Sequence, residues 1–132
     1  MPTLSEELCA VRDALERESG LRLGLVFGSV AKGTARTDSD IDVAVLADRP
    51  LTASDKIHLI ETLAQITGRA VDLIDLATAG HPVLGQVLAH GTRLLGSAAV
   101  QADVATRAVM DAADFFPYVE RMLKHRREAW IA

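Results

Sequence analysis

The sequence predicts an α/β (α+β) domain in which helices pack on a sheet. Strand-like and helix-like segments alternate along the chain, which is the pattern of such a fold. The length of 132 residues suits one ordinary domain. Hydrophobic residues make up 49% and charged residues 24% of the chain, a composition typical of globular proteins. This pattern does not tell whether neighbouring strands run parallel or in mixed directions.

The first 76 residues contain two helix-like and three strand-like segments. Apolar residues at helical spacing predict a helix over 3–20. Apolar runs predict strands over 21–27, 41–47 and 70–76. A second helix is predicted over 52–68, closed by Gly68. The residues that this second helix would turn inward are Ile57, Ile60, Leu63, Ala64 and Ile66.

The rest of the chain predicts a short helix over about 82–90, a short strand over 92–96 and a helical segment over about 99–130. Pro117 lies inside that last segment and is expected to kink or split it, because proline lacks the N–H donor of a helix interior. We expect a single domain over residues 1–132, with a core over about 1–97 followed by this C-terminal helical segment.

Charge and cysteine content limit the classes of function. The formal net charge of −4 argues against a general nucleic-acid-binding protein, so no direct nucleic-acid binding is expected. The single cysteine, Cys9, excludes an internal disulfide, fits a cytoplasmic setting and is expected in the core. The N-terminus lacks a signal-peptide pattern, and no apolar run approaches the roughly 18 residues of a membrane span. We therefore expect no contact with a membrane.

Two acidic residues, Asp40 and Asp42, stand where the strand over 41–47 begins. Residues i and i+2 of a strand point to the same face, so these carboxylates lie side by side. Adjacent carboxylates repel each other and are costly to bury without a cation. Oxygen ligands of this kind suit Mg²⁺ or Mn²⁺, which commonly link carboxylates to substrate phosphates.

Asp72 lies on the strand predicted over 70–76 and joins the pair if the two strands are neighbours. Three carboxylates are enough to hold two metal ions for an in-line phosphoryl displacement. Asp75, three residues further on, would point to the opposite face of a regular strand. Asp72 is preferred as the third ligand because it lies nearer the start of its strand.

A glycine-containing loop follows the strand over 21–27. Gly28 lets the backbone approach a phosphate, Ser29 adds a hydroxyl donor, and Lys32 is a further candidate phosphate contact. Ser39 would either fix the loop or contact the ligand. The stretch GSVAKGT has the spacing of a P-loop but lacks its lysine between the second glycine and the threonine, which argues against a P-loop ATPase.

These motifs resemble those of the nucleotidyltransferase superfamily typified by DNA polymerase β. Its pattern, hG[GS] then [DE]h[DE] then h[DE]h, is matched at Gly28-Ser29, at Asp40-x-Asp42 and at Asp72. The small size and the form GSxA[RK]G…SDxD are most similar to the minimal nucleotidyltransferases, the MntA-like antitoxins. The likeness is specific over 28–45, extends to Asp72 and thins over the C-terminal third. Lys32 stands where the family often has arginine, which keeps the charge.

The resemblance implies a polymerase β-like core with a small mixed sheet of about four strands. It also implies an antitoxin that transfers AMP from ATP to a tyrosine of a HEPN-type toxin, with pyrophosphate release, in a hetero-oligomer with that toxin. Two Mg²⁺ ions, or Mn²⁺, would assist. Metal binding and catalysis would fall to Asp40, Asp42 and Asp72, and nucleotide binding to Gly28, Ser29, Lys32 and Ser39.

Other functions stay open at this stage. The same core serves enzymes that modify small molecules. An antitoxin could also act by occlusion alone, and a nucleotide-binding regulator would need no transfer. The basic stretch ERMLKHRREAW is either a solvated helix end or a docking surface. The apolar anchors of that surface would be Phe115, Phe116, Tyr118 and Trp130.

Overall fold

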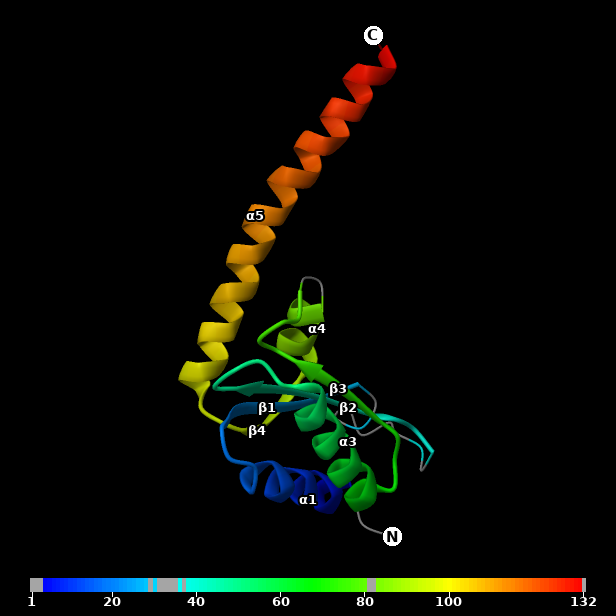
Figure 1. Ribbon diagram of the computed structural model, residues 1–132, viewed down its shortest axis with the longest axis vertical. Coiled ribbons are helices and arrows are strands. Elements are labelled where there is room, and N and C mark those ends of the chain that lie inside the picture. Colours follow the sequence, from blue (N-terminus) through cyan, green and yellow to red (C-terminus); the bar gives the residue numbers. More distant parts are fainter. Residues whose placement is uncertain (1–3, 29, 31–35, 37, 81–82, 132) are drawn as a thin grey trace.

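The computed structural model describes residues 4–28, 30, 36, 38–80 and 83–131 (Figure 1). Every strand predicted from the sequence is present, as is each predicted helix, with ends shifted by a few residues. In chain order the elements are α1 (Leu4–Glu16), β1 (Leu21–Phe27), β2 (Ile41–Ala47), α3 (Ala53–Thr67), β3 (Val71–Asp75), α4 (Val83–His90), β4 (Thr92–Leu95) and α5 (Ala98–Ile131).

The four strands form one mixed sheet in the order β3-β2-β1-β4. β1 pairs antiparallel with both β2 and β4, whereas β2 and β3 run parallel. The mixed four-stranded sheet expected from the family resemblance is therefore confirmed. Because β2 runs against β1 and alongside β3, the end of β1 and the starts of β2 and β3 meet at one edge of the sheet.

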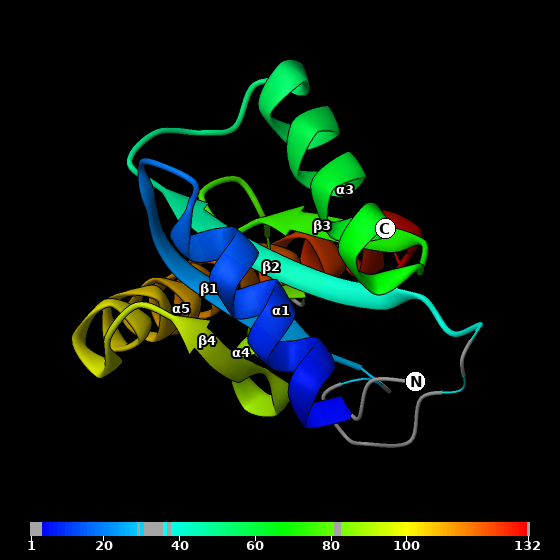
Figure 2. The same cartoon turned by 90° about the horizontal axis from the view of Figure 1, so that it is seen from below.

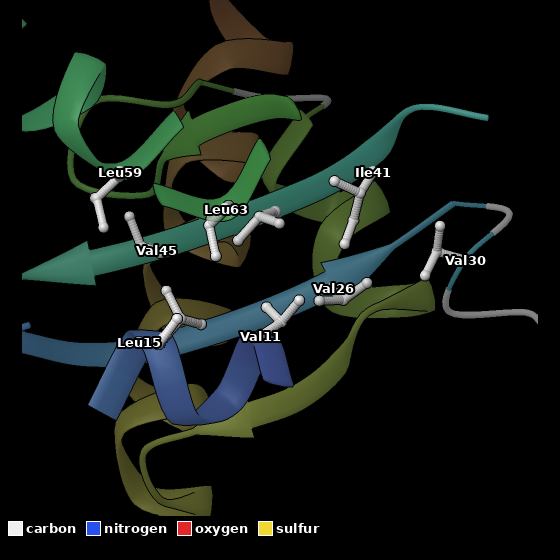
Figure 3. Close-up of a cluster of buried hydrophobic side chains, with 10 residues drawn as sticks. Val11, Leu15, Val26, Val30, Ile41, Val45, Leu59 and Leu63 are labelled. Carbon is white, nitrogen blue, oxygen red and sulfur yellow. The ribbon is translucent and has the colours of Figure 1, made fainter. Parts of the chain in front are cut away.

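Helices cover both faces of the sheet (Figures 1 and 2). On one face, α1 and α3 pack Val11, Leu15 and Leu63 against strand residues of β1 and β2 (Figure 3). On the other face, α4 and the start of α5 cover a second cluster that includes Leu23, Leu25 and Ala44. A strand covered on both faces buries consecutive residues, which explains why β1 and β2 are apolar at nearly every position.

The ends of α3 follow from its sequence. Thr52 and Asp55 form a capping box, and Gly68 ends the helix in the left-handed conformation at φ 67°. Two of the inward predictions for this helix are wrong: Ile57 is 57% exposed and Ile66 is 39% exposed. The reason is that α3 turns only a narrow face toward the sheet, and that face is centred on its two buried leucines, Leu59 and Leu63.

The long helix α5 packs on the sheet through Val104 and Ala108 and then extends away from it (Figure 1). It runs without a break through Pro117, so the helix is not split there, and a kink at Pro117 stays a prediction. One missing N–H donor bends a helix more readily than it ends one.

Cys9 is exposed, so the expectation that it lies in the core is wrong. Within the described ranges, no helix combines the length and apolar character needed to cross a membrane.

Candidate active site at the edge of the sheet

Strand pairing brings the predicted carboxylates together. The parallel register of β2 and β3 places Asp42 directly opposite Asp72. Asp42 alternates with the buried Val43 and so shares a face with Ala44, just as Asp72 shares a face with Ile74. Both carboxylates therefore lie on the face that α4 and α5 cover further along the strands.

The charges of Asp72 and Asp40 both act on the Asp42 carboxyl group. Burial raises the pKa of Asp42 above its ordinary 3.8, and the charges of Asp72 and Asp40 raise it further. A hydrogen bond shared with the Asp72 side chain acts in the same direction. The site therefore concentrates negative charge where β2 begins, and a cation would relieve it.

The donor set has the chemistry of a site for a hard divalent cation, because all three side chains offer carboxylate oxygens. As placed, however, the three do not form a group that could hold a metal ion, and neither does any other set of acidic, histidine or cysteine side chains in the described part of the chain. Asp42 and Asp72 are register partners on neighbouring strands, so their side chains start from adjacent backbone positions.

Asp75 lies away from this cluster, as the strand alternation predicts. Its side chain is buried, with 6% exposed, and belongs to the opposite face of β3. One carboxylate oxygen accepts a hydrogen bond from the Leu51 N–H and the other from the Ala77 N–H, both at 2.9 Å. Asp75 therefore ties the connections after β2 and β3 to the sheet.

Gly28 stands directly against the acidic cluster. Its φ of +77° belongs to the left-handed region that favours glycine. A Cβ built at this position would lie 2.3 Å from Oδ2 of Asp42, closer than any real contact. Glycine is thus needed both for the backbone turn and for the space that the Asp42 carboxylate occupies. Ser29 and Lys32, also predicted to bind the nucleotide, lie outside the described residues.

Ser39 fixes the turn that leads into Asp40. Its hydroxyl accepts a hydrogen bond from the Arg36 N–H at 2.9 Å, and its own N–H donates to the Arg36 carbonyl at 3.2 Å. This arrangement matches the loop-fixing alternative. Contact between Ser39 and a nucleotide stays a prediction.

The sequence-based reasoning missed Arg69 and Glu7. These two side chains are 8% and 11% exposed and form an ion pair with 2.5 Å between Nε and Oε1. Arg69 also reaches the turn before Asp40. A lone arginine between Gly68 and a strand is a weak signal, because its partners lie 62 and 30 residues away in the sequence.

A surface cavity of about 520 Å³ lies at the other end of the strands. It is lined by Gly20 and Leu21 before and at the start of β1, by Ala47 at the end of β2, and by His58 of α3. β1 runs from Leu21 at this cavity to Phe27, the register partner of Asp42. The cavity is therefore separate from the carboxylate cluster.

Known proteins are similar to this chain in sequence and in fold. Protein adenylyltransferase MntA of Shewanella oneidensis is 39% identical over 77 residues, which make up 58% of this chain and 55% of that protein. The match thus spans about half the length of that relative.

Two solved structures match the fold over nearly the whole chain. A chain from the crystal structure of a toxin–antitoxin with AMP-PNP has a TM-score of 0.69 at 29% identity, covering 95% of this chain and 94% of that one. A chain from the complex of tri-AMPylated Shewanella oneidensis HEPN toxin with MNT antitoxin has a TM-score of 0.64 at 25% identity, covering 95% of both.

The family model described as polymerase beta, nucleotidyltransferase, matches residues 10–99. That range is more than half of the chain and contains Gly28 and all three clustered carboxylates. The mixed four-stranded sheet and the structural matches agree with it. The chain therefore belongs to the polymerase beta nucleotidyltransferase family.

Proposed function

We propose that this protein is an antitoxin that transfers AMP from ATP to a tyrosine hydroxyl of a HEPN-type toxin. The observation that carries the proposal is the register pairing of Asp42 with Asp72, with Asp40 beside them and Gly28 against them. The names of the relatives support it, since one is a protein adenylyltransferase and another structure holds an AMPylated HEPN toxin with its antitoxin.

The proposed chemistry rests on the carboxylate oxygens that these three residues offer to a hard divalent cation. Asp40 and Asp42 would hold two Mg²⁺ ions, and Asp72 would share one of them. When bound, the ions supply positive charge against the triphosphate and the pyrophosphate leaving group. Gly28 would let its backbone approach the triphosphate, beside the Asp42 carboxylate that occupies the position of an added Cβ. Ser29 and Lys32 would add a hydroxyl and an ammonium donor to the phosphates.

The transfer itself is a displacement at the α-phosphorus. The tyrosine oxygen attacks that atom, the bond to the bridging oxygen of the β-phosphate breaks, and pyrophosphate leaves. Asp72 would help to take the proton of the attacking hydroxyl, the role that the family resemblance gives to this position.

The chain would be organised as a catalytic core followed by a helical segment. Residues 1–97 would form the catalytic core, and 99–130 the helical segment that completes the single domain. The protein would act in a hetero-oligomer with its toxin in the cytoplasm, a setting that the single cysteine supports.

Intact-mass spectrometry tests the proposal. The protein is incubated with ATP, Mg²⁺ and its purified toxin partner, in parallel with the double variant D40A/D42A. Asp48→Asn is the matched control, because Asp48 is an exposed carboxylate just beyond the other end of β2. We expect the toxin to gain the mass of one or more AMP units with the wild type and with D48N, and no mass with D40A/D42A.

Three results would contradict the proposal. Neutralisation of the toxin without mass gain, kept by D40A/D42A, would indicate occlusion. ATP binding without pyrophosphate release would indicate a regulator. Transfer to a hydroxylated small molecule, with the toxin unmodified, would indicate a small-molecule enzyme.

A further inference from the structure

The buried guanidinium of Arg69 joins three parts of the fold. Its Nε and Nη2 donate to the two carboxylate oxygens of Glu7 on α1, at 2.5 and 3.3 Å. Its Nη1 donates to the carbonyl of Ser39 at 2.9 Å and to the carbonyl of Arg36. One side chain therefore links the first helix, the α3–β3 connection and the turn that precedes β2.

The turn held in this way leads directly into the acidic cluster. The Ser39 carbonyl belongs to the peptide group that Ser39 shares with Asp40. The next contact along the chain is from the Ile41 N–H to the Ala70 carbonyl, at 2.9 Å, beside Arg69 itself. Asp40 thus lies between two fixed points, and both depend on the segment that carries Arg69.

We propose that Arg69, oriented by Glu7, is a positioning residue that sets where Asp40 stands relative to Asp42 and Asp72. Arg69 would act through the carbonyls of Arg36 and Ser39, and Glu7 by orienting Arg69. The inference rests on the proposed function, because the three carboxylates whose placement Arg69 and Glu7 would set are the proposed metal ligands.

The contacts that Arg69 makes with Glu7, Ser39 and Arg36 require an arginine. The planar guanidinium offers five N–H donors in a fixed fork, so it can hold a carboxylate with one edge and two carbonyls with the other. A lysine has a single ammonium on a flexible chain and cannot hold all three partners in one geometry. Glu7 neutralises the buried charge and fixes the plane of the fork.

The first experiment compares wild type, Arg69→Lys and Glu7→Gln. Mn²⁺ alone is titrated and followed by electron paramagnetic resonance, and AMP transfer is measured as kcat and KM for ATP. Outer-shell partners of metal ligands typically contribute about 10–100-fold in metal affinity or activity. We expect R69K to lose Mn²⁺ affinity and kcat within that range, while KM for ATP changes little.

If the Arg69–Glu7 ion pair contributed only to stability, two further variants would give a different result. Glu7→Leu combined with Arg69→Met replaces the buried pair by apolar side chains, a change that often keeps or raises stability. Thr52→Ala removes the N-cap of α3 and lowers stability without touching the 36–39 turn. We expect E7L/R69M to recover thermal stability but not Mn²⁺ affinity or kcat, and T52A to lose stability only.

The inference is overturned if R69K and E7L/R69M bind Mn²⁺ and transfer AMP as the wild type does, or if T52A loses Mn²⁺ affinity to the same extent. A wild-type protein that binds no Mn²⁺ also overturns it. A wild-type protein that binds Mn²⁺ but transfers no AMP contradicts the proposed function alone, because the Mn²⁺ titration of the variants still measures the positioning effect.

Discussion

Gly28→Ala is the sharpest single test of how the site is built. The backbone at this position has φ +77°, where an L-residue costs about 1–2 kcal/mol. The added methyl group would also lie 2.3 Å from Oδ2 of Asp42. Overpacking of this kind typically costs about 1–3 kcal/mol. We therefore expect the free energy of unfolding to fall by about 2–5 kcal/mol.

Gly20→Ala is the matched control. Gly20 has a similar φ of +85°, but the nearest atom to an added Cβ is Oδ2 of Asp48 at 3.7 Å, an ordinary contact. Its cost should be the backbone term alone, about 1–2 kcal/mol. The Asp42→Ala background provides a second control, because the Cβ of residue 42 would lie 3.8 Å from the new methyl group. In that background, Gly28→Ala should cost no more than Gly20→Ala.

Urea unfolding of the four proteins of this double-mutant cycle, together with Gly20→Ala, measures these differences. AMP transfer to the toxin is measured on Gly28→Ala and Gly20→Ala in parallel. Displacing the Asp42 carboxylate by about 1 Å should lower kcat by about 100-fold, with Gly20→Ala unchanged. The reasoning is refuted if Gly28→Ala lowers the free energy of unfolding as little as Gly20→Ala does. It is also refuted if Gly28→Ala lowers that free energy equally in the wild type and in the Asp42→Ala background.

Three further predictions concern carboxylates and a helix cap. Because the folded-state pKa of Asp42 is raised, the stability that the protonated Asp42 side chain contributes is present below pH 3.8 and is lost as pH rises through the folded-state pKa. Asp42→Asn removes the charge of this carboxylate and should therefore be more stable than wild type at pH 7 by about 0.2–1 kcal/mol, the range for cross-strand pairs. The gain should vanish below pH 3.8, where Asp42 of the wild type is protonated. Urea unfolding at several pH values measures this difference. Asp75→Ala leaves the Leu51 and Ala77 N–H groups without their acceptor and should lower the free energy of unfolding by about 1–3 kcal/mol, measured by the same method. Thr52→Ala should cost about 1 kcal/mol with kcat unchanged, and a fall in kcat measured well below its melting temperature would contradict the separation of α3 capping from the site.

Local sequence patterns predict the helices and strands and the placement of the acidic pair. Apolar residues at helical spacing predicted the helices and short apolar runs predicted the strands, because both patterns are local properties of the chain. The side-chain period of 2 along a strand put Asp40 and Asp42 on one face and predicted that Asp72 and Asp75 would diverge, as β3 shows. The motifs from Gly28 to Val45 were enough to indicate the family.

Tertiary structure decided which of these residues meet. The strand order and the parallel register of β2 and β3 make Asp72 the partner of Asp42, and no local pattern encodes that pairing. The narrow buried face of α3 depends on where the sheet lies. The Arg69–Glu7 pair joins residues 62 positions apart, so its partners exist only after the chain has folded. Local patterns depend on neighbouring residues in the sequence. Strand register and side-chain contacts depend on distant segments that come together only when the chain packs.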